Sequence, residues 1–129
     1  MGFLGSFVQQ VGFEPPTLVV AVGHDRAHLA AMRTTGAFAV SVLDPASKGL
    51  MAQFYKPPAA GADPFGGLET LRTPAGQWAL ANALAWIECQ VVAEQDVGDH
   101  VAVFGRATAG ALNREADPLV HLRRNGLSY

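Results

Sequence analysis

Residue types that could bind a ligand occur first in the opening segment, Gly2–Phe13. Gly5, Ser6 and two glutamines interrupt an otherwise apolar run there. Glycine lets another group approach the backbone closely, and a strand with polar interruptions turns one face to water. We therefore expect a ligand to lie against the first strand of the chain.

A second chemically interesting stretch, His24-Asp25-Arg26-Ala27-His28, opens a helical run that Gly36 should end. Asp25 is expected to cap this helix. Two histidines four residues apart, with an acidic residue between them, are also typical of a helical zinc site. We expect no metal here, because the pair opens the helix rather than lying inside it and no third ligand is evident.

Two further residues carry reactive side chains. Cys89 lies at the centre of a predicted strand with no activating cation, so we expect a small buried hydrophobe. As the one cysteine of the chain it forms no internal disulfide, which favours a reducing, cytoplasmic location. His100 follows a turn, where histidine is commonly solvated.

Length and charge exclude several classes of protein. The 129 residues suit one domain, residues 1–129. A formal net charge of −2 gives no basic face for nucleic acid or an anionic membrane surface. The apolar opening has no basic region and is broken by glycines and glutamines, so it predicts neither a signal peptide nor a membrane span.

Hydrophobic patterning predicts mainly β structure with two short helices. The predicted strands are Phe7–Phe13, Thr17–Gly23, Ala37–Leu43, Ala83–Glu94 and Val101–Leu112. Pro15-Pro16 should end the first strand, and Gly98 should turn the last two into a hairpin. In the strand Ala83–Glu94, Glu88 and Cys89 are expected on opposite faces.

The second helix is predicted over Ala46–Tyr55, with Asp44 as its N-cap and Pro45 at its first position. Lys56–Gln77 is expected to be a structureless lid or binding loop. The aromatic side chains of Phe54 and Phe65 would either pack in the core or form part of a lid over the ligand. A last short apolar run follows at Pro118–Leu122. Together these elements predict a small, Greek-key-like antiparallel barrel that binds ligands at its mouth or at a dimer seam.

Four stretches, taken as a set, resemble the flavin reductase-like family of FMN-binding split barrels. They are Gly2–Pro16, Gly36–Leu43, Ala83–Cys89 and Gly98-Asp99-His100. Within that family, the chain is most similar to the flavin reductase module of cyanobacterial flavodiiron proteins, and the similar segments are Gly2–Ser6, Lys56-Pro57 and Gly61–Asp63. The chain departs from the family pattern at Gly12, where serine is usual, and at His28, where threonine or serine is common. The family's first barrel strand, which would precede Gly2, is expected to be missing.

The resemblance implies a homodimer that binds FMN, or FAD, and transfers a hydride from NAD(P)H to the flavin. It places Leu4, Gly5, Ser6 and Phe7 along the polar edge of the flavin ring. It places Asp25, Arg26, Ala27 and His28 at the phosphate, where a helix N-terminus and a cation suit an anion. His100 would line the nicotinamide side of the ring as the catalytic residue.

Two other functions remain open at this point. The domain could be a non-catalytic flavin-binding module that passes electrons to a redox protein partner, as flavoredoxins do. It could also be a flavin-free structural barrel, which the missing first strand would favour. The colour of the purified protein separates the last alternative from the other two.

Overall fold

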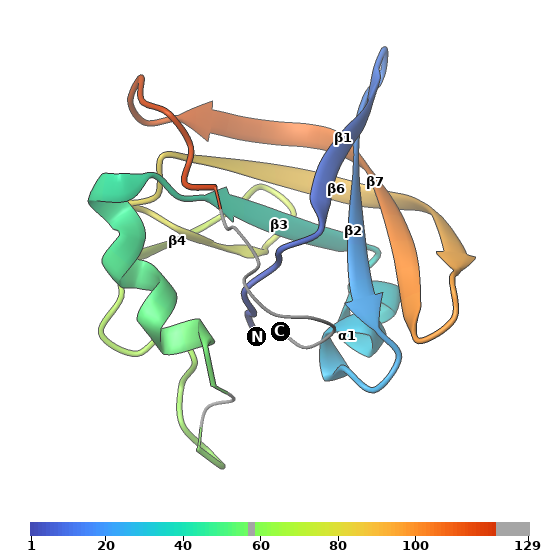
Figure 1. The fold of residues 1–129 in the computed structure, drawn as a ribbon, viewed down its shortest axis with the longest axis horizontal. Coiled ribbons are helices and arrows are strands. Elements are labelled where there is room, and N and C mark those ends of the chain that lie inside the picture. The colour runs from blue at the N-terminus through green and yellow to red at the C-terminus, as the bar shows by residue number, and fades with distance from the viewer. Residues whose placement is uncertain (57–58, 121–129) are drawn as a thin grey trace.

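The computed structural model describes residues 1–56 and 59–120, and its main element is a five-stranded antiparallel sheet of order β1-β2-β7-β6-β3. A second sheet pairs β4 with β5. The strands are β1 (Val8–Phe13), β2 (Pro16–Gly23), β3 (Ala37–Val42), β4 (Thr70–Arg72), β5 (Trp78–Leu80), β6 (Ala85–Asp96) and β7 (His100–Leu112). The large sheet is strongly curved, and β1 and β2 run across the direction of β3 and β6 (Figure 1). The predicted mainly β, antiparallel architecture with two helices is confirmed.

The core lies between the concave side of this sheet and helix α1 (Ala27–Thr35). Leu29 and Met32, one helical turn apart, are both buried and pack against Val22 and Val103 of the sheet in one hydrophobic cluster. Phe38 of β3 belongs to the same cluster. No helix in the described part of the chain is long and apolar enough to cross a membrane.

The second helix differs in type from the prediction. The segment η1 (Pro45–Phe54) is a 3₁₀ helix rather than an α-helix over Ala46–Tyr55. Its predicted N-cap is confirmed, because the Asp44 carboxylate accepts a hydrogen bond from the Ser47 backbone N–H, 2.9 Å away. Gly49 lies in the middle of the segment, where it weakens an α-helix.

The Asp44 carboxylate also accepts hydrogen bonds from the guanidinium of Arg114, which follows β7. Arg114 Nε donates to Asp44 Oδ2 at 2.7 Å, and its Nη2 donates to Oδ1 at 2.6 Å. Asp44 is 1% exposed, so this bidentate pair joins the end of the long hairpin to the start of η1 inside the protein. The hydrogen bonds from Arg114 and Ser47 hold the pKa of Asp44 well below its usual range.

Lys56–Gln77 was predicted to lack structure, and this was wrong for its end. Thr70–Arg72 forms β4, which pairs with β5 as a short hairpin. Three-residue strands are too short to show a hydrophobic period, which explains the error. In the last predicted run, Leu119 N–H donates to the Leu43 carbonyl at 2.6 Å; His121 and Leu122 lie outside the described residues.

Candidate functional site

The first predicted ligand segment lies beside the end of β2. Val8 pairs with Val20, and the Phe7 carbonyl accepts a hydrogen bond from the Ala21 N–H at 3.1 Å. Because β1 and β2 are antiparallel, residues before Phe7 continue alongside the residues that follow Ala21. Leu4–Phe7 therefore runs toward the end of β2 from which α1 begins.

His100 and the start of α1 meet at Gly23, the last residue of β2. Gly23 pairs with His100 across the sheet, and its carbonyl accepts the Arg26 N–H at 3.0 Å. A Cβ built on Gly23 would lie 2.9 Å from Asp25 Oδ1, 3.5 Å from Arg26 Cγ and 3.9 Å from His100 Nε2. The side chains of Asp25, Arg26 and His100 thus converge on Gly23, where a Cβ would displace the Asp25 carboxylate.

The start of α1 differs from the prediction in its cap. Arg26, not Asp25, is the N-cap residue, and no side chain caps the helix. The turn from Gly23 to Arg26 contains Asp25, so the helix begins one residue later than expected. An uncapped helix N-terminus with an arginine beside it and no acidic residue in its first turn suits an anion.

His28 fixes the opening segment on α1. Its Nε2 lies 3.2 Å from the Gly2 carbonyl oxygen, and its ring centroid lies 4.6 Å from that of Phe3. Burial lowers the pKa of His28, so the neutral imidazole donates from Nε2 to this carbonyl. Among the described residues, His28 Nδ1 is buried with no hydrogen-bond partner.

On its other side, the opening segment touches an aromatic cluster of Phe54, Phe65 and Trp78. A Cβ on Gly2 would lie 2.9 Å from the Phe54 ring and 3.0 Å from the Phe65 ring. The Phe54 and Phe65 rings pack edge to face at 5.6 Å, and Trp78 lies 6.3 Å from Phe65. Phe54 and Phe65 therefore pack against Gly2, which favours core packing over a role as a lid for these two side chains.

Two histidine–aspartate pairs connect the turn between β6 and β7 to the surrounding structure. His100 Nδ1 lies 2.9 Å from Asp99 Oδ1, and this contact holds the pKa of Asp99 below its usual range. His24 Nε2 lies 3.0 Å from Asp96 Oδ2. His24 and His28 thus contact different groups, and the part of the chain that the structure describes holds no set of three metal-ligating side chains.

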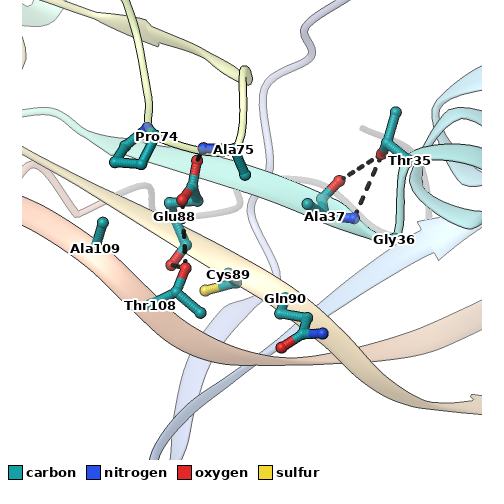
Figure 2. A pocket seen from close by; sticks show the side chains of 10 residues that line it. All are labelled: Thr35, Gly36, Ala37, Pro74, Ala75, Glu88, Cys89, Gln90, Thr108 and Ala109. Atoms are coloured by element: carbon teal, nitrogen blue, oxygen red, sulfur yellow. Dashed lines mark hydrogen bonds between the residues drawn. The ribbon is translucent and has the colours of Figure 1, made fainter.

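A cavity of about 490 Å³ lies elsewhere, over β6 and β7 and beside the turn between β4 and β5. Figure 2 shows Glu88 reaching from β6 toward Ala75 on one side and Thr108 on the other. Its carboxylate accepts the Ala75 N–H at 2.9 Å and the Thr108 hydroxyl at 3.3 Å. The predicted flavin residues do not line this cavity, and Glu88 serves to fix the small hairpin on the main sheet.

Glu88 and its neighbour Cys89 are both buried, because Glu88 contacts the β4–β5 hairpin while Cys89 belongs to the hydrophobic core. The register of β6 against β7 shifts between these two residues and leaves Thr108 of β7 without a partner in the ladder, which marks a β-bulge. Cys89 is 0% exposed, as predicted for a small buried hydrophobe. Burial, with a smaller contribution from Glu88, raises the pKa of its thiol to about 11.

Sequence reasoning missed two residues of this region, Gly23 and Asp96. Gly23 was assigned to the end of a strand and Asp96 to a turn, and neither was connected with the ligand. A glycine at a strand end next to a His-Asp-Arg stretch could have indicated close packing. Asp96 gave no comparable indication, because its partner His24 is 72 positions away in the printed sequence.

Comparisons with known proteins show the family to which the chain belongs. The family model described as flavin reductase like domain matches residues 2–126. Diflavin flavoprotein A 1 of Synechocystis sp. is 35% identical over 128 residues, which cover 98% of this chain and 22% of that protein. A related chain of Nostoc sp. is 39% identical over 128 residues, with the same shares of 98% and 22%. The chain thus spans about a fifth of the length of these relatives.

Solved structures share the fold. The NADH:FAD oxidoreductase of Streptomyces globisporus superposes with a TM-score of 0.76 at 25% identity, over 82% of this chain and 64% of that one. The styrene monooxygenase flavin reductase of Pseudomonas putida gives a TM-score of 0.72 at 26% identity, over 86% and 69%. The curved sheet and the family match define an oxidoreductase domain of the flavin reductase class. The chain belongs to the flavin reductase-like family, as its sequence motifs predicted.

Proposed function

We propose that this domain binds FMN at the end of β2 and uses reduced nicotinamide to reduce it. The observation that carries the proposal is the convergence of Asp25, Arg26 and His100 on Gly23, with Leu4–Phe7 alongside. When bound, the flavin would supply the redox chemistry by accepting a hydride at N5. The protein would bind the ring, orient it and leave one face open to the nicotinamide.

The residues present fit a flavin with one phosphate. The uncapped N-terminus of α1 offers backbone N–H groups, and Arg26 supplies a positive charge. His28 supplies no such charge in its neutral form; instead it holds Gly2, and through it the Leu4–Phe7 backbone, in place. This arrangement favours FMN over FAD, since it offers one helix N-terminus for one phosphate.

His100 is the residue that we propose on the nicotinamide side. It opens β7 beside Gly23, and Asp99 contacts its Nδ1. That contact fixes the orientation of the imidazole. We further propose that two copies of the domain associate as a homodimer, as in the family that the chain resembles.

One observation favours a second version of this function. The diflavin relatives are about five times as long as the matched segment, as the 22% share shows. A domain within such a protein would pass electrons from its flavin to another centre of the same chain. In that version the domain binds FMN tightly and oxidises NADH slowly when alone.

The test is a visible absorption spectrum of the purified protein with added FMN, followed by NADH or NADPH under anaerobic conditions. Flavin bands that bleach within the mixing time support the reductase. Bands that persist with both nucleotides support the electron-transfer version. A protein that binds neither FMN nor FAD overturns both, and size-exclusion chromatography with light scattering tests the homodimer separately.

A further inference from the structure

The turn between β6 and β7 is connected to the loop between β2 and α1 by two contacts from one residue. The His24 backbone N–H donates to the Asp99 carbonyl at 3.1 Å. The His24 side chain contacts Asp96, with Nε2 3.0 Å from Oδ2. This loop and this turn are therefore held together at both the main chain and the side chain.

Asp96 uses its two carboxylate oxygens for two different elements. Oδ1 accepts the Gly98 N–H at 3.2 Å and so closes the turn, in which Gly98 has a φ of 91°. Oδ2 is the oxygen that contacts His24 on the neighbouring loop. One carboxylate thus sets both the shape of the turn and its position relative to the loop.

The two connected elements carry opposite sides of the proposed site. The turn ends in Asp99 and His100, the proposed nicotinamide side. The loop leads through Asp25 to Arg26, the proposed phosphate side. Any shift of the turn relative to the loop would change the position of His100 relative to Arg26.

We propose that Asp96 is a positioning residue for nicotinamide binding, because its carboxylate joins the turn that carries His100 to the loop that carries Arg26 through His24. This inference rests on the proposed flavin reductase function. It assigns Asp96 no contact with flavin or nicotinamide. Its effect is on how the nicotinamide binds relative to the flavin.

The contact is partly exposed to solvent, with 43% of the His24 side chain and 67% of the Asp96 side chain accessible, so its effect should be modest. The other charges that face this region are Asp99 and His100 on the turn and Asp25 and Arg26 on the loop. Arg33 and Glu94 form a separate pair farther along α1 and β6, with Arg33 Nη2 2.8 Å from Glu94 Oε2.

The test replaces Asp96 by asparagine, which keeps an oxygen for Gly98 but removes the charge opposite His24. We expect the KM for the nicotinamide to rise by about threefold to fivefold, the size that an exposed charged contact can supply. FMN affinity, the melting temperature and kcat should change little. The matched control is Glu94→Gln, which removes a charge two positions earlier on the same strand but breaks a pair with Arg33 of α1 rather than with the loop.

Two measurements separate positioning from general structure. In a His24→Gln background, Asp96→Asn should have no further effect on KM, because the partner is already lost. Hydrogen exchange of the His24 amide should be faster in Asp96→Asn and unchanged in Glu94→Gln. Equal KM values for wild type and Asp96→Asn, or equal effects of both variants on KM, would overturn the inference.

Failure of the proposed reductase function would give a different experimental result from failure of the positioning role. If the wild-type protein binds no flavin or oxidises no nicotinamide, the reductase proposal fails. The exchange rate of the His24 amide still tests the contact in that case, since it needs neither flavin nor turnover. An unchanged rate in Asp96→Asn would then overturn the positioning role as well.

Discussion

His28 on α1 holds Gly2 at the start of the chain, with 3.2 Å between the imidazole Nε2 and the carbonyl oxygen. Replacing His28 by phenylalanine keeps a ring against Phe3 but removes the donor. We expect FMN binding to weaken by about threefold to tenfold, the effect of one lost hydrogen bond, in a fluorescence titration. Thr34→Ala is the control, because it removes a 2.9 Å hydrogen bond from the same helix at its other end. Equal affinities for wild type and His28→Phe would contradict a role of this contact in the site.

Gly23→Ala should disturb the proposed site directly. The new Cβ would lie 2.9 Å from Asp25 Oδ1, so the Asp25 side chain must move away from its position beside Arg26. We expect FMN affinity to fall by about threefold to tenfold, because the rearranged side chain lies in the proposed phosphate site. Gly49→Ala serves as the control, because nothing lies within 4 Å of a Cβ there. If both variants bind FMN like the wild type, the site lies elsewhere.

Gly105 on β7 tests the core rather than the site. A Cβ at this position would lie 2.5 Å from the Phe38 ring and 2.7 Å from Cys89 Cβ. Gly105→Ala should therefore lower the free energy of unfolding by about 1–3 kcal/mol in urea titrations. The Gly49→Ala protein again provides the comparison. A stability equal to that of the wild type would show that β7 and Phe38 do not pack as described.

The pair between Asp44 and Arg114 predicts how stability depends on pH. The pKa of Asp44 is lowered in the folded protein by its hydrogen bonds from Arg114 and Ser47, below the reference value of 3.8. The stabilisation is thus present above about pH 4 and is lost as the pH falls below that value. Asp44→Asn should be less stable than the wild type at pH 6, and the two should converge toward pH 2. Urea midpoints across this range give the comparison, and a constant difference would contradict it.

Cys89 should be inert in the folded protein. Its thiol is buried and has a pKa of about 11, so at pH 8 roughly one molecule in a thousand carries the thiolate. A thiol reagent should therefore react with the native protein at least a hundredfold more slowly than with the protein in 6 M guanidinium chloride. Rapid labelling without denaturant would indicate that β6 opens readily.

The sequence predicted the features that depend on neighbouring residues. Pro15 lies in the turn between β1 and β2, Gly98 turns β6 into β7, and Asp44 caps the segment that Pro45 begins. Each of these follows from the chemistry of one or two residues at a chain reversal or a helix end.

The features that depend on pairing between distant segments could not be predicted in this way. The bulge at Thr108 of β7, opposite Glu88 and Cys89, arises from the register of β6 against β7. The N-cap at Arg26 follows from the turn that begins at Gly23, which is itself held by pairing with His100. Sequence motifs point to Leu4–Phe7 and Asp25–His28 separately, but that the opening segment runs toward the start of α1 follows from the pairing of β1 with β2.

Gly2 contacts His28 on one side and lies against the rings of Phe54 and Phe65 on the other. This close packing affects where a tag can be attached to the protein. A purification tag or fluorescent protein fused directly to Met1 would emerge beside these rings and compete with them for space. A long polar linker would keep such a tag away from the proposed site. The exposed turn at Gly61, where a Cβ would meet nothing within 4 Å, offers a position for an inserted label that leaves the opening segment undisturbed.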